Sequence, residues 1–238
     1  MRLLFMQMDR KCFERKYFED WHAYNKKRLA IRRLYFDVLK WANNFAAFNL
    51  LRGEGSRALD VGCAHGYVVK LLADLGYDAY GCDVSDFYIR NYAKSEADSL
   101  VICDAQNLPF VERSFKLITA LEVLEHLQSP ISFLKDCFKV LEPNGVLVMQ
   151  TPRAIPSLDM LLSKLYGIVV FKTGDVEHHV STFVNGEQLS RLLELCGFKV
   201  VLQTWFLLPF NPLIFERYFP TRIPSAVPTF RVVAFKAK

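Results

Sequence analysis

Between residues 57 and 150 the sequence alternates short apolar runs with segments of helical periodicity, and this alternation restricts the fold more than any other feature. Strands are predicted at 57–61, 78–82, 100–103, 115–121 and 146–150, with helices at 67–75, 85–94 and 129–141. A further helix at 186–196 and strands at 198–205 and 230–235 follow. Because parallel strands need crossover helices, the pattern predicts an α/β chain with a doubly wound, mostly parallel sheet.

The composition agrees with a globular protein that has a large core. Of the 238 residues 52% are apolar and 23% are charged, which excludes a disordered chain. The longest uncharged run, 200–215, contains two prolines and is shorter than the roughly 18 residues expected of a spanning helix. The N-terminus has too short an apolar stretch for a secretory signal. Six cysteines without a CxxC pair predict buried free thiols, as in a reducing cytoplasm, where we expect the protein.

The sequence suggests one main domain with additional lids. We predict a helical N-terminal lid at 1–52 and a binding domain at 53–238, with lid insertions at about 153–176 and 206–229. The net charge of +5 is concentrated in the first 57 residues, as in a solvated helix face or a surface that contacts phosphates. The insertion at 206–229 is rich in proline and aromatic residues. It fits a packed lid, a site for an apolar or lipid-linked molecule, or shallow membrane contact.

A glycine loop, Asp60-Val61-Gly62-Cys63-Ala64-His65-Gly66, follows the first predicted strand and opens a helix. Glycine at such a turn permits close approach of backbone to a ligand. Asp83, at the end of the second strand, follows Gly62 by close to the roughly 20 residues expected of a ribose-binding carboxylate. The loop alone is weak evidence, and its position between strand and helix strengthens it.

Acidic residues at three strand ends distinguish between nucleotide ligands. Asp60 stands at the head of the loop, Asp83 ends the second strand and Asp104 follows the third. These carboxylates would repel a pyrophosphate, which disfavours an NAD-dependent oxidoreductase. They suit a nucleoside that carries an ammonium and a sulfonium, as S-adenosylmethionine (SAM) does. In the alternative, Asp60 merely caps the following turn, and Asp83 is an ordinary carboxylate at the end of a strand.

The segments 60–66, 104–110 and 121–127, together with Asp83, resemble class I SAM-dependent methyltransferases over about 57–151 and 177–205. The resemblance is to small-molecule types, such as type 11/23 and ubiquinone-pathway O-methyltransferases. It implies a Rossmann-like seven-stranded sheet of order 3-2-1-4-5-7-6 with strand seven antiparallel. It also implies that the loop binds the methionine part, Asp83 the ribose, and Asp104 with Ala105 the adenine. The implied cofactor-binding residues are Asp60, Gly62, Cys63, Ala64, His65, Gly66, Asp83, Val84, Asp104, Ala105, Leu121 and Glu122. Ala64 departs from the family's usual glycine.

A metal site is a second hypothesis. Glu122, Glu125 and His126 would share one face if their segment were helical, and His179 would supply a fourth ligand to a divalent ion such as Mg²⁺. The resemblance to ubiquinone-pathway and small-RNA 2′-O-methyltransferases implies such an ion. In the alternative, Glu122 closes the cofactor pocket, Glu125 caps locally and His126 packs. The candidate catalytic bases are His126, His178 and His179.

The predicted function is SAM-dependent methyl transfer, most readily to an oxygen of a small or lipid-linked acceptor. An RNA methyltransferase and a non-catalytic SAM-binding module are the alternatives. No RNA-binding motif accompanies the basic segment. The segment after the fourth strand, Leu121-Glu122-Val123-Leu124, lacks the Asn/Asp-Pro-Pro-Tyr/Phe pattern of enzymes that methylate base nitrogens.

Overall fold

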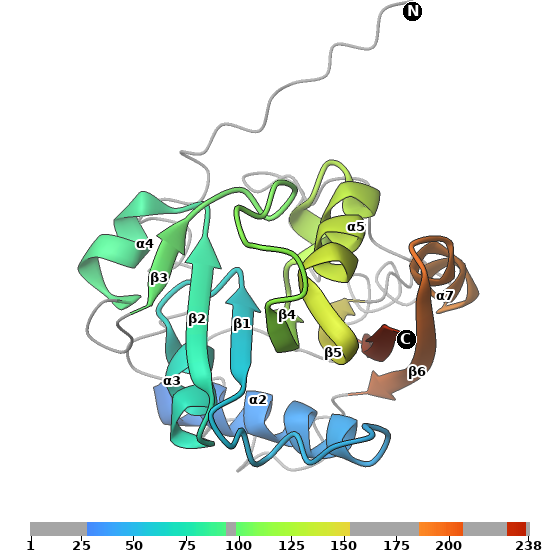
Figure 1. Cartoon of the computed structure of the whole chain (residues 1–238), viewed down its shortest axis with the longest axis horizontal. Helices are drawn as coiled ribbons and strands as arrows, with labels where there is room; N and C mark the ends of the chain where they lie inside the picture. The colour runs from blue at the N-terminus through green and yellow to red at the C-terminus, as the bar shows by residue number, and fades with distance from the viewer. Residues whose placement is uncertain (1–27, 94–98, 153–185, 207–227, 237–238) are drawn as a thin grey trace, which may run out of the picture.

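The computed structural model describes residues 28–93, 99–152, 186–206 and 228–236, which form a seven-stranded sheet with helices on both faces (Figure 1). The strand order is β3-β2-β1-β4-β5-β7-β6, as predicted. Strands β1 to β5 pair in parallel, and β7 is antiparallel to both β5 and β6. The strands are β1 Arg57–Val61, β2 Asp78–Asp83, β3 Leu100–Ile102, β4 Phe115–Leu121, β5 Leu141–Pro152, β6 Phe198–Phe206 and β7 Pro228–Lys236.

The helices divide between the two faces of the sheet. The helical elements are α2 Arg28–Asn43, α3 Tyr67–Asp74, α4 Asp86–Asn91, the 3₁₀ helix η4 Leu124–His126, α5 Pro130–Val140 and α7 Gly186–Leu195. Buried side chains of α5 and α7, including Phe133 and Leu193, form one apolar core with the sheet. Side chains of α2 and α3, including Leu39 and Leu72, form the core of the opposite face. The sheet is therefore covered on both sides, as its nearly continuous apolar strands require.

Helix α2 belongs to the segment predicted as an N-terminal lid. Its residues Val38, Leu39 and Ala42 are fully buried against the sheet and α3. This part of the segment therefore contributes to the core of the domain. Residues 1–27 and the two predicted insertions lie wholly or mostly outside the described residues, so their role as lids stays a prediction.

Two predicted helix starts are confirmed by their caps. The hydroxyl of Ser85 accepts a hydrogen bond from the amide of Tyr88 at the start of α4. The hydroxyl of Ser129 accepts one from the amide of Ser132 at the start of α5, where Pro130 occupies the first turn. Such caps satisfy amides that have no partner inside the helix.

Strand β5 differs from the prediction at its beginning. It starts at Leu141 rather than at residue 146 and includes the Pro143-Asn144-Gly145 turn. Its pairing with β4 shifts register between Phe115 and Leu117, and Asn144 has a φ of 61°. The predicted turn residues therefore form an irregularity within the strand.

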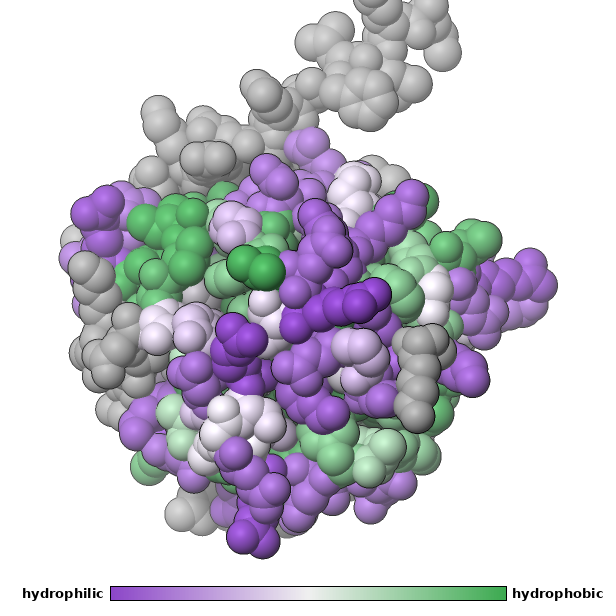
Figure 2. All heavy atoms as spheres, in the orientation of Figure 1, coloured by the Kyte–Doolittle hydropathy of each residue, from purple (hydrophilic) through white to green (hydrophobic). Residues whose placement is uncertain are grey.

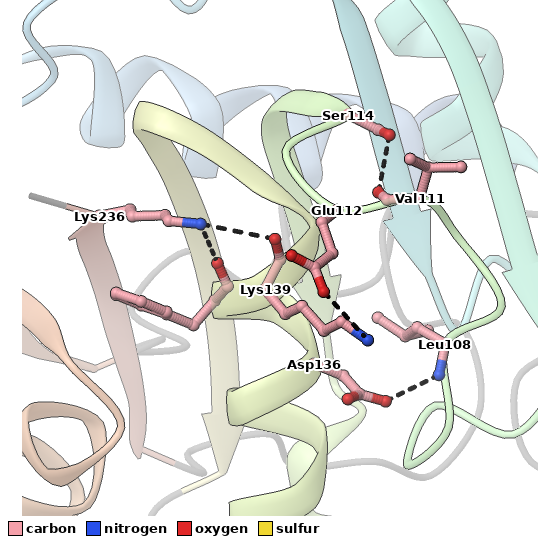
Figure 3. Close-up of polar contacts among 8 residues, drawn as sticks. Leu108, Val111, Glu112, Ser114, Asp136, Lys139 and Lys236 are labelled. Carbon is pink, nitrogen blue, oxygen red and sulfur yellow. Dashed lines mark hydrogen bonds and ion pairs between the residues drawn. The ribbon is translucent and has the colours of Figure 1, made fainter. Parts of the chain in front are cut away.

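The C-terminal end of α5 is tied to the last strand of the sheet by Lys236. The Nζ of Lys236 donates to the carbonyl oxygens of Phe138 at 2.6 Å and Leu141 at 2.7 Å. Figure 3 shows this lysine reaching the carbonyls at the helix end, beside the more exposed Lys139–Glu112 ion pair. A cation at this position satisfies carbonyls that lack helical partners and matches the negative end of the helix dipole.

Hydrophilic side chains cover much of the face drawn in Figure 2, with smaller hydrophobic areas between them. The five cysteines in the described ranges are free thiols, and four of them are buried, as predicted. None of the described helices is long and apolar enough to cross a membrane.

Candidate functional site

The predicted glycine loop joins β1 to α3 at the carboxyl edge of the sheet, where ligands bind in open α/β folds. The amides of Gly62 and Cys63 both donate to the carbonyl of Cys82, at 2.8 and 3.0 Å, which holds the loop against β2. Gly62 has a φ of 72°, and a Cβ there would lie 2.5 Å from Cγ2 of Val123. Glycine is therefore required twice, by the backbone conformation and by the neighbouring segment after β4.

Asp83 organises this loop through its carboxylate. Its Oδ2 accepts a hydrogen bond from the amide of Ala64 at 2.8 Å, and its Oδ1 accepts one from the amide of Ser85 at 2.8 Å. Burial raises the pKa of Asp83, and these hydrogen bonds counteract part of that rise. The carboxylate thus connects the loop to the start of α4, and further acceptor capacity remains for hydroxyl groups.

Asp60 is a buried carboxyl group at the head of the loop. Its side chain is 3% exposed, and its Oδ1 accepts a hydrogen bond from the hydroxyl of Thr119 on β4 at 2.7 Å. Burial raises the pKa of Asp60 from 3.8 to about 7; the hydrogen bond from Thr119 lowers it, and the negative charge of Asp83 raises it. A cationic ligand close to Asp60 and Asp83 would stabilise the charged forms of both side chains.

The third acid, Asp104, lies in the loop after β3. Its Oδ1 accepts hydrogen bonds from the amide of Gln106 at 2.9 Å and from the side-chain Nε2 of Gln106 at 3.2 Å. The loop is attached to α5 at two points: Oε1 of Gln106 accepts from the amide of Ser129, and Oδ2 of Asp136 accepts from the amide of Leu108 at 2.9 Å. Figure 3 shows the second attachment. The sequence indicated Asp104 but not the residues that hold its loop in place.

His65 packs among aromatic rings of α3 and α4. Its ring centroid lies 4.7 Å from that of Tyr92, 4.8 Å from that of Tyr88 and 5.4 Å from that of Tyr67. The side chain is buried. These ring contacts hold His65, which the resemblance implies is a cofactor-binding residue, against Tyr67, Tyr88 and Tyr92.

The segment after β4 places Glu122 and Glu125 in the same buried region. Glu122 has a φ of 59°, and its Oε1 accepts a hydrogen bond from Nε2 of Gln150 on β5 at 2.8 Å. The Oε2 of Glu125 accepts one from the hydroxyl of Thr151 at 3.0 Å. Burial raises the pKa of both acids, and the neighbouring charge of Glu122 raises that of Glu125 further. Burial and mutual repulsion therefore disfavour the fully ionised pair, and a cation nearby would offset this.

The geometry does not reproduce the metal site predicted from this segment. Only Leu124–His126 is helical, as a 3₁₀ turn, so Glu122 does not share a helical face with Glu125 and His126. Within the described ranges, no three His, Cys, Asp or Glu side chains are arranged to hold a metal ion. The residues predicted as further ligand or base, His178 and His179, lie outside the described residues.

The remaining predicted residues lie at the same edge. Cys63 and Leu121 are buried, and Val84 and Ala105 are half-buried. All predicted cofactor residues thus lie at or just beyond the carboxyl ends of β1 to β4.

Polar residues that the sequence analysis missed support this edge from neighbouring strands. They are Thr119 on β4, Gln150 and Thr151 on β5, and Arg231 on β7. The sequence does contain a signal for these residues. Each is a polar residue in an otherwise apolar strand, near the end of the strand that lies at the site. Polar side chains at such buried positions are seldom retained without hydrogen-bond partners.

A family model described as a methyltransferase domain matches residues 32–203. Among curated proteins, a probable S-adenosylmethionine-dependent methyltransferase of Mycolicibacterium smegmatis is 29% identical over 63% of this chain and 54% of its own length. The ubiquinone biosynthesis O-methyltransferase of Roseobacter denitrificans is 29% identical over 67% of this chain and 66% of its own. The chain therefore spans between about half and two thirds of the length of these relatives.

Solved structures share the fold at low sequence identity. A Haloferax volcanii complex between the Trm112 methyltransferase activator and a protein described as a methyltransferase matches with a TM-score of 0.67 and 16% identity. That match covers 94% of this chain and 100% of the matched chain. A Haemonchus contortus phosphoethanolamine N-methyltransferase 2 in complex with S-adenosyl-L-methionine matches with a TM-score of 0.60 and 14% identity, over 94% of this chain and 60% of that chain.

Proposed function

This chain belongs to the methyltransferase domain family, and we propose that it transfers a methyl group from SAM to an oxygen atom of a small or lipid-linked acceptor. The observation that carries the proposal is the arrangement of Asp60, Asp83 and Asp104 at the ends of three adjacent strands around a glycine loop. Acids so placed, of which Asp60 is buried, favour a cationic nucleoside over a phosphorylated one.

Each acid has a role that its surroundings support. Asp60 is buried with a raised pKa, so an ammonium group beside it would stabilise its charged form. Asp83 is fixed by two amides and retains acceptor capacity for the ribose hydroxyls. Asp104 is held by Gln106, and we propose that it binds the adenine, as the resemblance implies.

Methyl transfer from a sulfonium is a displacement with an already activated leaving group. The protein therefore contributes mainly by aligning the two reactants and excluding water from between them. Acceptance by an oxygen is easier when a neighbouring base takes the hydroxyl proton. His126, half-buried with Nε2 3.9 Å from Oε1 of Glu125, is the described residue that we propose for this role. His178 and His179 remain further candidates from the sequence.

The preference for oxygen is drawn from the relatives named ubiquinone biosynthesis O-methyltransferase. The proposal extends to an apolar acceptor because of the proline- and aromatic-rich segment at 206–229. We do not include a metal ion, because Glu122 does not share a helical face with Glu125 and His126, and no three candidate ligands converge within the described ranges. If an ion is nevertheless required, EDTA will abolish methyl transfer and Mg²⁺ will restore it.

The test has a binding step and a transfer step. In calorimetry at pH 7, S-adenosylhomocysteine is expected to bind and NAD is not. With SAM labelled in its methyl group, label is then expected in ethers of phenol or catechol acceptors, and more in prenylated acceptors than in short ones.

The controls separate the alternatives. Label found in added total RNA would favour an RNA methyltransferase. Label found only in amines would contradict an oxygen acceptor. Binding of S-adenosylhomocysteine without transfer to any phenol, catechol, amine or RNA would favour a non-catalytic module, and absence of binding would contradict the whole proposal.

A further inference from the structure

A chain of polar side chains crosses two strands of the sheet and ends at Glu122. Arg231 on β7 lies opposite Gln150 on β5 in the strand register, and its Nε donates to Oε1 of Gln150 at 3.2 Å. Nε2 of Gln150 in turn donates to Oε1 of Glu122 at 2.8 Å. Arg231 is 3% exposed and Gln150 is 5% exposed. A cation and a carboxyl group are thus connected through one amide inside the protein.

The surroundings make it energetically costly to bury these linked polar side chains. The strand neighbours of Gln150 and Arg231 on the same face are Val148 and Val233, both fully buried in the core beneath α2. Burial lowers the pKa of Arg231, and the carboxylate of Asp37 on α2 partly compensates. Apolar residues at these positions would avoid the cost of desolvating a guanidinium and an amide. The presence of Arg231 and Gln150 at these buried positions is therefore better explained by a functional role than by packing.

The chemistry of the three groups sets the direction of the middle amide. A guanidinium has donors and no acceptor, so Gln150 must turn its oxygen toward Arg231. Its NH₂ group then faces Glu122, where it donates to the carboxylate. Without Arg231 the Oε1 of Gln150 would lose this donor, and of these two contacts only the one with Glu122 would restrain the amide. Arg231 therefore fixes Gln150, and Gln150 fixes Glu122.

Glu122 is held at a position that adjoins the glycine loop. Its amide donates to the carbonyl of Gln150 at 2.8 Å, so the same residue restrains both its backbone and its side chain. The next residue, Val123, would touch a Cβ at Gly62. Glu122 thus lies beside the loop that we propose to bind the methionine part of SAM.

We propose that Gln150 and Arg231 are positioning residues that hold the carboxylate of Glu122 toward the place where the methyl group is transferred. This inference rests on the proposed function. In this position the carboxylate of Glu122 stabilises the positive charge that accompanies the methyl group during transfer. It also keeps the methyl group aligned with the acceptor. Gln150 acts directly on Glu122, and Arg231 acts through Gln150.

Two nucleoside probes report this charge without a known acceptor. S-adenosylhomocysteine carries no charge at its sulfur, whereas sinefungin carries an ammonium-bearing carbon in that place. The ratio of their dissociation constants, measured by calorimetry at pH 7, reports stabilisation of a cation there. Because both ligands bind the same folded protein, partial unfolding of a variant cancels in the ratio.

Gln150→Met is expected to reduce the preference for sinefungin about tenfold, as is Glu122→Gln. Arg231→Met is expected to reduce it by roughly threefold or more, and Arg231→Lys, which keeps a cation, is expected to retain most of it. Lys236→Met is the matched control, because it removes a cation from the other end of β7. It should leave the ratio unchanged even if it lowers the melting temperature.

A preference within twofold of the wild-type value in Gln150→Met would overturn the positioning role. The same result in Glu122→Gln would show that Glu122 does not face the transferring centre, which also overturns the inference. A protein that binds neither probe would instead contradict the proposed function itself.

Discussion

The carboxylate of Asp83 accepts hydrogen bonds from two backbone amides, and we propose that it also accepts them from the ribose hydroxyls. Asp83→Ala should weaken binding of S-adenosylhomocysteine by roughly 1–3 kcal/mol, because charged hydrogen bonds to the ligand and to the loop are lost. Calorimetry measures this. Asp78→Ala, at the exposed start of the same strand, should change affinity by less than about 0.5 kcal/mol. Equal affinity in wild type and Asp83→Ala would remove Asp83 from the site.

Gly62 offers a second test at the residue scale. Gly62→Ala adds a methyl group both at a positive φ and within 2.5 Å of Val123, so nucleoside binding should fall below detection in a thermal-shift titration. Gly55→Ala is the matched control: its φ is 77°, but nothing lies within 4 Å of the added atom. Unaltered binding in Gly62→Ala would mean that the contact with Val123 is not needed to shape the loop.

Residues with a fixed spacing from a strand end were predictable, and residues that support them were not. Asp60, Asp83 and Asp104 each follow an apolar run, so the sequence locates them at one edge of a parallel sheet. Arg231 reaches Gln150 only because β7 inserts beside β5, which is a long-range pairing. The spacing of residues along the chain contains no information about that contact.

Among the elements, the C-terminal end of α5 is held to β7 by Lys236, which donates to two carbonyls at the helix end, in addition to the apolar core that the two elements share. Lys236→Met should reduce the free energy of unfolding by about 1–3 kcal/mol without changing nucleoside affinity. Urea denaturation measures the loss. Lys139→Met breaks only the exposed pair with Glu112 and should cost less than about 1 kcal/mol. Equal losses in the two variants would argue against a special role for Lys236.

Local sequence patterns predicted most of the described strands and helices but not the conformation of the segment after β4. The strands and helices described from residue 57 onward followed from the sequence pattern, since each helix buries one regular face and the central strands are nearly continuously apolar. The metal hypothesis required the segment from Glu122 to His126 to be helical, yet Glu122 adopts a positive φ. The amide of Glu122 donates to the carbonyl of Gln150 on β5, and Nε2 of Gln150 donates to the carboxylate of Glu122. Both hydrogen bonds favour this conformation over a helical one.

For the molecule as a whole, the buried acids predict how stability varies with pH. The pKa of Asp60 in the folded state, about 7, lies above its ordinary value of 3.8. The folded protein therefore binds a proton more tightly than the unfolded chain. The stability that this proton contributes is present below pH 3.8 and is lost as the pH rises through about 7.

Relative to Asp60→Asn, the ligand-free wild type should lose stability between pH 5 and pH 8, by on the order of a few kcal/mol. Urea denaturation at several pH values measures the free energy of unfolding of both proteins. The difference between the two proteins cancels the contributions of the other buried acids, which both contain. Asp78→Asn, an exposed carboxylate, should follow the wild-type curve. Parallel curves for wild type and Asp60→Asn would show that Asp60 titrates normally.

The insertion of β7 between β5 and β6 has a consequence for synthesis. Strand β6 leaves the ribosome first, yet its hydrogen-bonding neighbour in the sheet is a strand that has not yet been made. Until β7 emerges, the nascent chain exposes the open edge of β5 and an unpaired apolar strand together. Chaperone binding during translation should therefore be strongest in that interval.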